Sequence, residues 1–295
     1  MRADVEKMSD ARNQISARGE PDRTAPANLG ESAAGSASPD TGDAFSQLRR
    51  DFEHGATLRT LTVVVPMYRE EKRIERTIAT LAGSGLHRHD IGFCFVDDGS
   101  PDDTIARTYG AIARFGLRNA EVLRLDRNCG KGGAVRAGIL HVAVGSQLVG
   151  FLDADLSLDP SEVITGIARL ELTGADALVG ERIVQTAKQP KIRRLGSLLF
   201  RRLASSLVPT GVRDSQCAMK LFRSEVAVPL FVAMETTGFA FDVELMARLK
   251  RGRYVVTETP VLWEHQAGSQ INAGTDAVRM IREVLAIRRM LRTGS

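Results

Sequence analysis

Residues 148–160 read LVGFLDADLSLDP, a nearly apolar run that ends in three aspartates, Asp153, Asp155 and Asp159. The apolar part has the length and composition of a buried β-strand. Side chains two positions apart in an extended backbone point the same way, which would place Asp153 beside Asp155. Two unpaired carboxylates would repel each other, whereas a hard divalent cation between them would stabilise both. A polar strand end with a helix cap at Asp159 is the simpler alternative for this motif alone.

Apolar runs of strand length alternate with segments of helical periodicity on both sides of this stretch. The runs predict strands at 61–68, 90–100, 120–126 and 176–179, and the apolar spacing predicts helices at 70–85, 102–116, 130–144 and 160–173. This alternation is typical of an α/β protein with a mostly parallel sheet covered on both faces. Beyond residue 180 the pattern loosens into amphipathic segments within 181–208, 239–252 and 275–291 and a strand-like run at 254–263.

Four polar clusters follow the first strands of this pattern, at 66–71, 97–98, 128–131 and 153–155. Ligands of open α/β sheets bind outside the carboxyl ends of the strands, which is where these clusters fall. The glycine-rich run at 128–138, NCGKGGAVRAG, lets a ligand approach the backbone at a helix start, and Lys131 adds charge there. It matches neither the P-loop nor the dinucleotide pattern. Four clusters at one edge therefore favour a single site.

Residues 1–57 differ in composition from the rest of the chain. They are rich in Ala, Gly, Ser, Pro and Asp without apolar periodicity, so we expect a disordered tail and assign residues 58–295 to the folded domain. The tail lacks the apolar core of a signal peptide, and no apolar run approaches the roughly 20 residues that span a bilayer. The scattered Cys94, Cys129 and Cys217 indicate reduced thiols, so the expected location is cytoplasmic, with a place at the cytoplasmic face of the membrane as an option.

The domain is basic. Of the 40 Lys and Arg residues, 33 lie in 58–295, against 26 of the 36 Asp and Glu residues, which gives this part a net charge of +7. Nucleic acid, a phosphorylated small substrate and an anionic membrane surface all suit this charge. Aromatic residues interleaved with the basic ones, and the recognised motifs of nucleic-acid binders, are both missing, so a nucleic-acid partner is not expected.

Seven segments together resemble the family 2 glycosyltransferases of the GT-A fold, a Rossmann-like α/β fold. They cover about Leu58 to Leu291 in the family's order and read VVVPMYREEKRI, FVDDGSPDDT, NCGKGGAVRAG, DADLS, RDSQCAMKLF, FAFDVEL and VLWEHQAGSQI. They are most similar to the polyprenyl-phosphate hexose synthases, particularly the dolichyl-phosphate β-glucosyltransferase branch. The resemblance implies a hexosyltransferase that moves glucose from UDP-glucose to a polyprenyl phosphate with inversion.

The resemblance also implies roles for individual residues. Pro66, Tyr68 and Glu70 would line the nucleotide pocket, Asp98 would bond the base, and Lys131 would lie near the nucleotide. Asp153 and Asp155 would hold Mg²⁺ or Mn²⁺ on the diphosphate, with Asp155 as the stronger ligand. The basic positions expected to hold phosphates are Arg182 and Arg194.

The need for a general base depends on the acceptor. The second pKa of a phosphate monoester is about 6, so it is already a nucleophile at pH 7 and needs no strong base. A hydroxyl acceptor would need one, and the candidates are Asp214, Asp242 and Glu244. Each has a structural alternative: Asp214 in a local ion pair with Arg213, the other two as acidic residues of a helix start.

Two departures from the family pattern bear on the substrate. Ala218 replaces a glycine of the acceptor-side motif, and Leu156-Ser157 stand where mannose synthases usually have Gln-His, which counts against a mannose synthase. The segments RDSQC, FDVEL and VLWEHQAGS favour the glucosyl branch. A GDP-mannose-dependent synthase, a transferase for a soluble acceptor and a nucleotidyltransferase remain the enzyme alternatives, and a sugar-nucleotide-binding protein the non-enzyme one. Apolar residues flanked by arginines within 191–208 and 276–292 further suggest peripheral contact with an anionic membrane, although both stripes can instead pack onto the domain.

Overall fold

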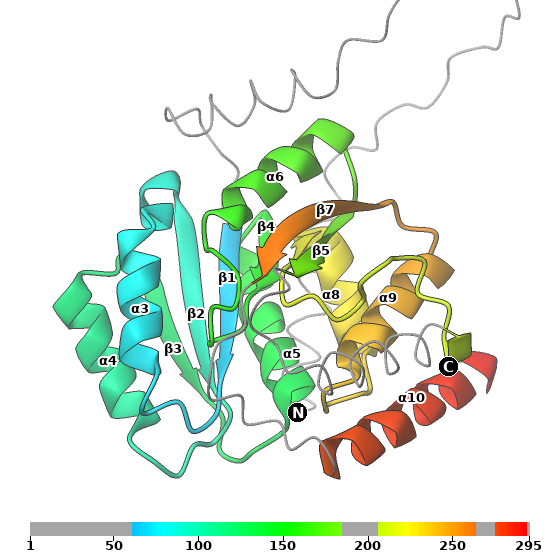
Figure 1. Ribbon diagram of the computed structural model, residues 1–295, viewed down its shortest axis with the longest axis horizontal. Coiled ribbons are helices and arrows are strands. Elements are labelled where there is room, and N and C mark those ends of the chain that lie inside the picture. Colours follow the sequence, from blue (N-terminus) through cyan, green and yellow to red (C-terminus); the bar gives the residue numbers. More distant parts are fainter. Residues whose placement is uncertain (1–60, 185–205, 264–274, 294–295) are drawn as a thin grey trace, which may run out of the picture. The chain divides into compact units, whose positions relative to one another are not determined.

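The computed structural model describes residues 61–184, 206–263 and 275–293 (Figure 1). The strands are β1 (Leu61–Met67), β2 (Ile91–Asp97), β3 (Ala120–Arg124), β4 (Leu148–Phe151), β5 (Ala177–Val184), β6 (Lys220–Arg223) and β7 (Val256–Trp263). The α-helices are α3 (Ile74–Gly83), α4 (Thr104–Phe115), α5 (Lys131–Val142), α6 (Glu162–Thr173), α8 (Ser224–Ala233), α9 (Phe241–Arg251) and α10 (Thr275–Thr293). Two short 3₁₀-helices are η1 (Leu86–His89) and η2 (Ala143–Gly145). The predicted tail and Arg194 lie outside the described residues.

The strands form one sheet in the order β3-β2-β1-β4-β6-β5-β7. The first four strands of this order are mutually parallel, and β5 is parallel to β7. β6 runs antiparallel to both of its neighbours, β4 and β5. The register aligns the last residues of β1, β2 and β3, so their carboxyl ends meet at one edge of the sheet. The predicted α/β class with a mostly parallel sheet is confirmed.

The central strands β1, β2 and β4 are almost wholly apolar and are buried on both faces of the sheet. Val63 and Val65 point into the core that α3 and α6 cover, whereas Val64 between them points into the core under α5, α8 and α9. This alternation is the period of two expected of a strand. Gly138 of α5 allows that helix to approach closely, since a Cβ there would lie 2.6 Å from Val64 Cγ1. Helix α5 therefore packs closely on β1 and β2.

Three elements of the second half differ from the sequence prediction. The four-residue β6 and the helix α8 fall in segments for which the sequence pattern predicted no element type. Helix α8 contains Pro229 in its interior, a residue that usually argues against a helix. Strand β5, predicted to end at 179, extends to Val184 because β7 pairs with it along its whole length, so the loop expected from residue 181 is wrong for 181–184. The other predicted elements agree with the observed ones to within about four residues.

The C-terminal helix α10 packs on α9. Val284 and Ile287 of α10 are buried in a small core with Val243 and Ala247 of α9, whereas Leu285 remains exposed. Part of the apolar stripe predicted to reach a membrane is therefore occupied by contacts within the domain. None of the helices in the described part of the chain combines the length and apolar character needed to cross a bilayer.

Candidate active site

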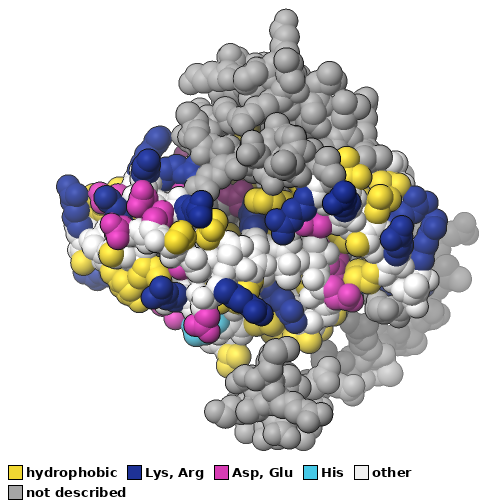
Figure 2. Space-filling model, turned by 90° about the horizontal axis from the view of Figure 1, so that it is seen from below, with side chains coloured by type: hydrophobic (Ala, Val, Ile, Leu, Met, Phe, Trp, Pro, Cys, Tyr) yellow, Lys and Arg dark blue, Asp and Glu magenta, His cyan; other side chains and the backbone are white. Residues whose placement is uncertain are grey.

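A cavity of about 350 Å³ lies at the carboxyl ends of β1, β2 and β4, beside the start of α5. Seven residues predicted for the site line it: Pro66, Tyr68, Glu70, Asp98, Lys131, Asp153 and Asp155. Figure 2 views the molecule from the side to which β1, β2 and β3 point in Figure 1, and groups of Lys and Arg side chains are spread over this face with Asp and Glu between them. The sheet thus gathers four separate sequence clusters into one cavity.

Asp153 and Asp155 are presented by a turn. Strand β4 ends at Phe151, the Leu156 N–H donates to the Asp153 carbonyl at 3.2 Å, and Leu156 has a left-handed backbone with φ of 46°. The expectation that an extended backbone aligns the two carboxylates is therefore wrong in its geometry. The Thr77 hydroxyl of α3 donates to the Ala154 carbonyl at 2.6 Å, which ties the turn to the rest of the domain.

Charge interactions link the two aspartates to α5. Lys131 Nζ lies 2.6 Å from Asp153 Oδ1, and the Ser157 N–H donates to Asp155 Oδ1 at 3.0 Å. Burial, together with the neighbouring Asp153 carboxylate, raises the pKa of Asp155. Burial opposes the charge of Lys131, but Asp153 and Asp242 outweigh it and raise the pKa of its ammonium. The site therefore holds two acidic groups that gain from an added cation, with one lysine partly neutralising them.

The donor set fits a divalent cation shared with a substrate. Carboxylate oxygens are the ligands that Mg²⁺ and Mn²⁺ prefer. Within the described ranges, no three His, Cys, Asp or Glu side chains gather into a complete metal cluster. Mg²⁺ commonly binds through one or two carboxylates and completes its shell with water and substrate phosphates. Asp153 and Asp155 suit that arrangement.

Asp98 positions the glycine-rich loop. Its carboxylate accepts hydrogen bonds from the backbone N–H groups of Cys129 at 2.6 Å and Gly130 at 2.9 Å. Burial raises the pKa of Asp98, and these two donors oppose the rise. Gly130 is required here because its φ is 85° and a Cβ would lie 2.5 Å from the Thr237 carbonyl. The role in base recognition predicted for Asp98 stays a prediction, beside this observed role in holding the loop.

The loop after β1 forms another part of the cavity wall. Glu70 accepts two hydrogen bonds from Arg73, from Nε at 2.8 Å and from Nη2 at 2.6 Å, and its N–H donates to the Thr104 hydroxyl at 2.8 Å. Burial raises the pKa of Glu70 despite the guanidinium of Arg73. The Arg69 guanidinium lies 5.2 Å from the centre of the Tyr68 ring. These contacts fix the shape of the wall that Pro66, Tyr68 and Glu70 contribute.

Arg182 and Asp214 form a buried pair next to the cavity. Asp214 is 1% exposed and accepts two hydrogen bonds from Arg182, from Nε at 2.7 Å and from Nη2 at 2.9 Å. The local pair considered for Asp214 is not formed, because Arg213 lies 3.2 Å from Glu181 instead. Burial opposes the charge of Arg182, but Asp214 raises the pKa of its guanidinium. Neither side chain lines the cavity wall.

Asp242 and Glu244 at the start of α9 are also buried in pairs. Asp242 lies 2.7 Å from Lys220 Nζ, and Lys220 in turn donates to the Cys217 carbonyl at 2.6 Å. Glu244 accepts hydrogen bonds from Arg248 and from the backbone N–H groups of Glu235 and Thr236. Burial raises the pKa of Asp242, against the influence of Lys220 and Lys131. In the structure Glu244 holds the loop before α9, and its catalytic role stays a prediction.

The cavity lining also includes residues that the sequence did not place at the site. Among them are Arg73, Gly238, Phe239 and Arg279. Arg73 belongs to the family motif VVVPMYREEKRI and Phe239 to FAFDVEL, but the resemblance implied no function for either residue. Arg279 was attributed to a membrane-facing stripe, and its position on the cavity depends on how α10 packs.

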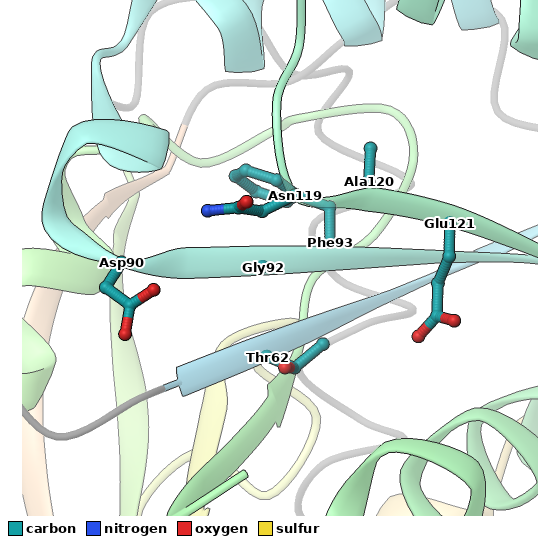
Figure 3. Close-up of a pocket in the computed structure, with 7 residues that line it drawn as sticks. All are labelled: Thr62, Asp90, Gly92, Phe93, Asn119, Ala120 and Glu121. Atoms are coloured by element: carbon teal, nitrogen blue, oxygen red, sulfur yellow. The ribbon is translucent and has the colours of Figure 1, made fainter. Parts of the chain in front are cut away.

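A second hollow of similar volume, about 350 Å³, lies at the opposite edge of the sheet, where β1, β2 and β3 begin (Figure 3). Its lining consists of Thr62, Asp90, Gly92, Phe93, Asn119, Ala120 and Glu121. It has two acidic side chains and no basic one, so it offers no positive charge to a phosphorylated ligand. The cavity at the carboxyl ends is the candidate active site.

A parallel sheet with an acidic turn and a glycine-rich helix start at its carboxyl edge is the arrangement of a GT-A glycosyltransferase. The model of the family described as "Glycosyl transferase family 2" matches residues 62–231. The chain belongs to this family, and it is a glycosyltransferase.

Relatives with assigned activities are similar over most of the chain. A dolichyl-phosphate beta-glucosyltransferase of Saccharomyces cerevisiae is 30% identical in an alignment 250 residues long, which covers 77% of this chain and 74% of the relative. The human dolichyl-phosphate beta-glucosyltransferase is 29% identical, over 80% of this chain and 77% of its own length. Glucosyl-3-phosphoglycerate synthase from Mycobacterium tuberculosis, solved with Mg²⁺ and UDP, shares the fold with a TM-score of 0.59 and 21% identity, over 82% of this chain and 81% of its own.

Proposed function

We propose that the protein transfers glucose from UDP-glucose to a polyprenyl phosphate by a single, metal-dependent, inverting displacement. The observation that carries the proposal is the combination of the Asp153–Asp155 turn beside Lys131 with similarity to dolichyl-phosphate beta-glucosyltransferases over three quarters of both chains. Both carboxylates needed for metal binding are present, which argues against a protein that only binds sugar nucleotides. The glucosyl donor follows the named activity of the relatives.

The donor diphosphate would lie against the acidic turn and the start of α5. A divalent cation on Asp153 and Asp155 would neutralise the negative charge that develops on the leaving nucleoside diphosphate. Lys131 adds a fixed positive charge at the same place, and Asp98 keeps the loop that carries it in position. Pro66 and Tyr68 supply wall area for the nucleoside.

The ion pairs of the three candidate general bases favour a phosphate acceptor over a hydroxyl acceptor. Asp214, Asp242 and Glu244 are each buried in an ion pair with Arg or Lys, and none of them lines the cavity. A general base must reach the proton that it removes, and each of these three carboxylates is instead held by its ion pair. A phosphate monoester needs no such base because it is already ionised at pH 7. The acceptor class implied by the relatives therefore agrees with the chemistry of the site.

A matrix of donors and acceptors tests the proposal. Purified protein is incubated with UDP-glucose or GDP-mannose, and with a short polyprenyl phosphate or 3-phosphoglycerate, in the presence of Mg²⁺ or EDTA. We expect product from UDP-glucose and the polyprenyl phosphate alone, lost with EDTA, and an inverted anomeric centre by NMR. Transfer to 3-phosphoglycerate but not to the lipid would show that the acceptor is not a polyprenyl phosphate. Turnover in the presence of EDTA would contradict the proposed role of the metal.

A lipid acceptor requires contact between the enzyme and a membrane surface. Arginine beside apolar side chains suits such contact, at roughly 1 kcal/mol per basic residue near an anionic surface. Flotation with vesicles that contain anionic lipid should recover the protein at low salt and lose it at high salt. Changing Arg193, Arg194, Arg201 and Arg202 together to Ser should weaken recovery. A protein that stays unbound at low salt while it glycosylates a soluble acceptor would end the lipid-phosphate proposal.

A further inference from the structure

The C-terminal helix α10 contributes an arginine to the wall of the active-site cavity. Arg279 lines the cavity together with Gly238 and Phe239, although more than 120 residues separate it from Asp153 and Asp155. Its side chain is 61% exposed, compared with 25% for Arg73 and 23% for Lys131, the other basic residues of the lining. Arg279 is therefore the most accessible positive charge of the described cavity wall.

Contacts one helical turn further along hold this part of α10 in place. Glu283 Oε2 accepts a hydrogen bond from the Ala240 N–H at 2.9 Å, and Glu283 also contacts the position that a Cβ of Gly238 would occupy. Arg279 Nε lies 3.3 Å from Glu283 Oε1, on the same helix face. The buried Val284 and Ile287 anchor the helix on α9. The position of Arg279 over the cavity thus follows from fixed contacts of its helix.

The charges of the cavity lining leave Arg279 able to bind an anion. Four carboxylates, from Glu70, Asp98, Asp153 and Asp155, face three basic groups in the wall. Arg73 and Lys131 each pair with one of these carboxylates at 2.6 Å. The partner of Arg279, Glu283, lies outside the lining and is shared with a backbone donor. The guanidinium of Arg279 contacts Glu283 through Nε, so its other N–H groups can bind an anion in the cavity without breaking an ion pair between lining residues.

We propose that Arg279 is a substrate-binding residue that donates hydrogen bonds to phosphate oxygens of a substrate in the cavity. The phosphate belongs either to the diphosphate of the donor or to the acceptor, and the recognition chemistry is the same for both. The inference rests on the proposed function for the presence of phosphorylated substrates. It also gives α10 a role in the site that is separate from any contact with a membrane.

The test compares Arg279→Ser with Arg282→Ser, a matched control because Arg282 is an exposed arginine of the same helix outside the cavity lining. Titration calorimetry with Mg²⁺ measures the affinity of each variant for UDP and for uridine, which has no phosphate. Steady-state kinetics measure KM for the polyprenyl phosphate, and calorimetry the melting temperature. Loss of a charge-assisted hydrogen bond should weaken binding of the phosphorylated ligand about 10- to 100-fold.

Weaker UDP binding with unchanged uridine binding assigns Arg279 to the donor diphosphate. Unchanged UDP binding with a KM for the acceptor raised about 10-fold or more assigns it to the acceptor phosphate. The inference is overturned if Arg279→Ser and Arg282→Ser have the same affinity for UDP and the same KM for the acceptor. It is also overturned if uridine binding by Arg279→Ser falls as much as UDP binding. Activity of the unaltered protein is measured first, so failure of the lipid acceptor as a substrate is seen separately, and KM is then measured with the acceptor that the protein does use, while the UDP comparison still decides whether Arg279 binds the donor diphosphate.

Discussion

Replacing Glu244 with Gln should separate a structural role of this residue from a catalytic one. Glu244 is fully buried, and its carboxylate accepts hydrogen bonds from Arg248 Nε at 2.7 Å, the Thr236 N–H at 2.7 Å and the Glu235 N–H at 3.0 Å. Glutamine has nearly the same shape but no charge, and its amide group brings a donor to a place where three donors already converge. The variant therefore leaves the 13% exposed guanidinium of Arg248 without its buried counter-charge.

Removing one partner of a buried ion pair costs about 3–5 kcal/mol. Arg248 Nη2 also lies 3.6 Å from the exposed Glu235 carboxylate, so the lower end, about 3 kcal/mol, is expected. For a domain of this size, that loss lowers the melting temperature by roughly 6–12 °C. Scanning calorimetry measures the shift in melting temperature. The kcat values of the variant and the unaltered protein are compared at a temperature well below both melting temperatures, where we expect them to differ less than about threefold.

A double variant is the control. Changing Arg248 to Met together with Glu244→Gln removes the stranded charge, and the pair should be less destabilised than the sum of the single variants. A general base contributes about 10²–10⁴ to the rate. The structural assignment would therefore be refuted by a melting temperature within about 2 °C of the unaltered protein combined with a kcat at least 100-fold lower.

Three further predictions concern the metal site, the tail and the thiols. Asp155→Ala should abolish transfer with little change in melting temperature, and added Mn²⁺ should not restore it; appreciable residual turnover would exclude metal binding by this carboxylate. Deletion of residues 1–55 should leave melting temperature and turnover nearly unchanged, and a large loss of either would show that the tail contributes to the fold. At pH 8 a thiol reagent should label Cys129 rapidly, because burial raises the pKa of Cys94 to about 12 and of Cys217 to about 11, which leaves almost no thiolate at those two positions. UDP with Mg²⁺ should slow the labelling, whereas labelling of all three thiols at equal rates would contradict the burial.

The first half of the fold was predictable because each element carries its own signal. Strands β1, β2 and β4 are nearly apolar runs of strand length, and the helices α3 and α4 have regular apolar spacing. Strand β6 has no such signal: four residues, one of them the buried Lys220, become a strand because β4 and β5 pair with them on either side. The charge of Lys220 is accommodated by Asp242, a residue that only the folded chain brings near. Sequence patterns do not contain that information.

The same distinction applies to the site. The rule that ligands bind at the carboxyl ends of parallel strands was sufficient to collect Glu70, Asp98, Lys131 and the acidic turn in one cavity. The partners of buried carboxylates were not predictable, because Asp214 pairs with an arginine 32 positions away rather than with its neighbour in the sequence. The contribution of Arg279 was equally hidden, since an amphipathic helix does not reveal which side of its polar face meets a cavity.

The placement of β6 has a consequence for the order in which the chain can fold during synthesis. The edge of β4 that β6 will cover has only apolar residues, and about 70 residues must be made between the end of β4 and the end of β6. At ribosomal speeds this takes roughly 4 to 14 s, during which a nascent half-sheet presents an unprotected edge. Such edges recruit other strands and cause aggregation. Expression of fragments that stop before residue 220 is therefore expected to yield inclusion bodies, and slower elongation over 152–219 should increase the demand for chaperones.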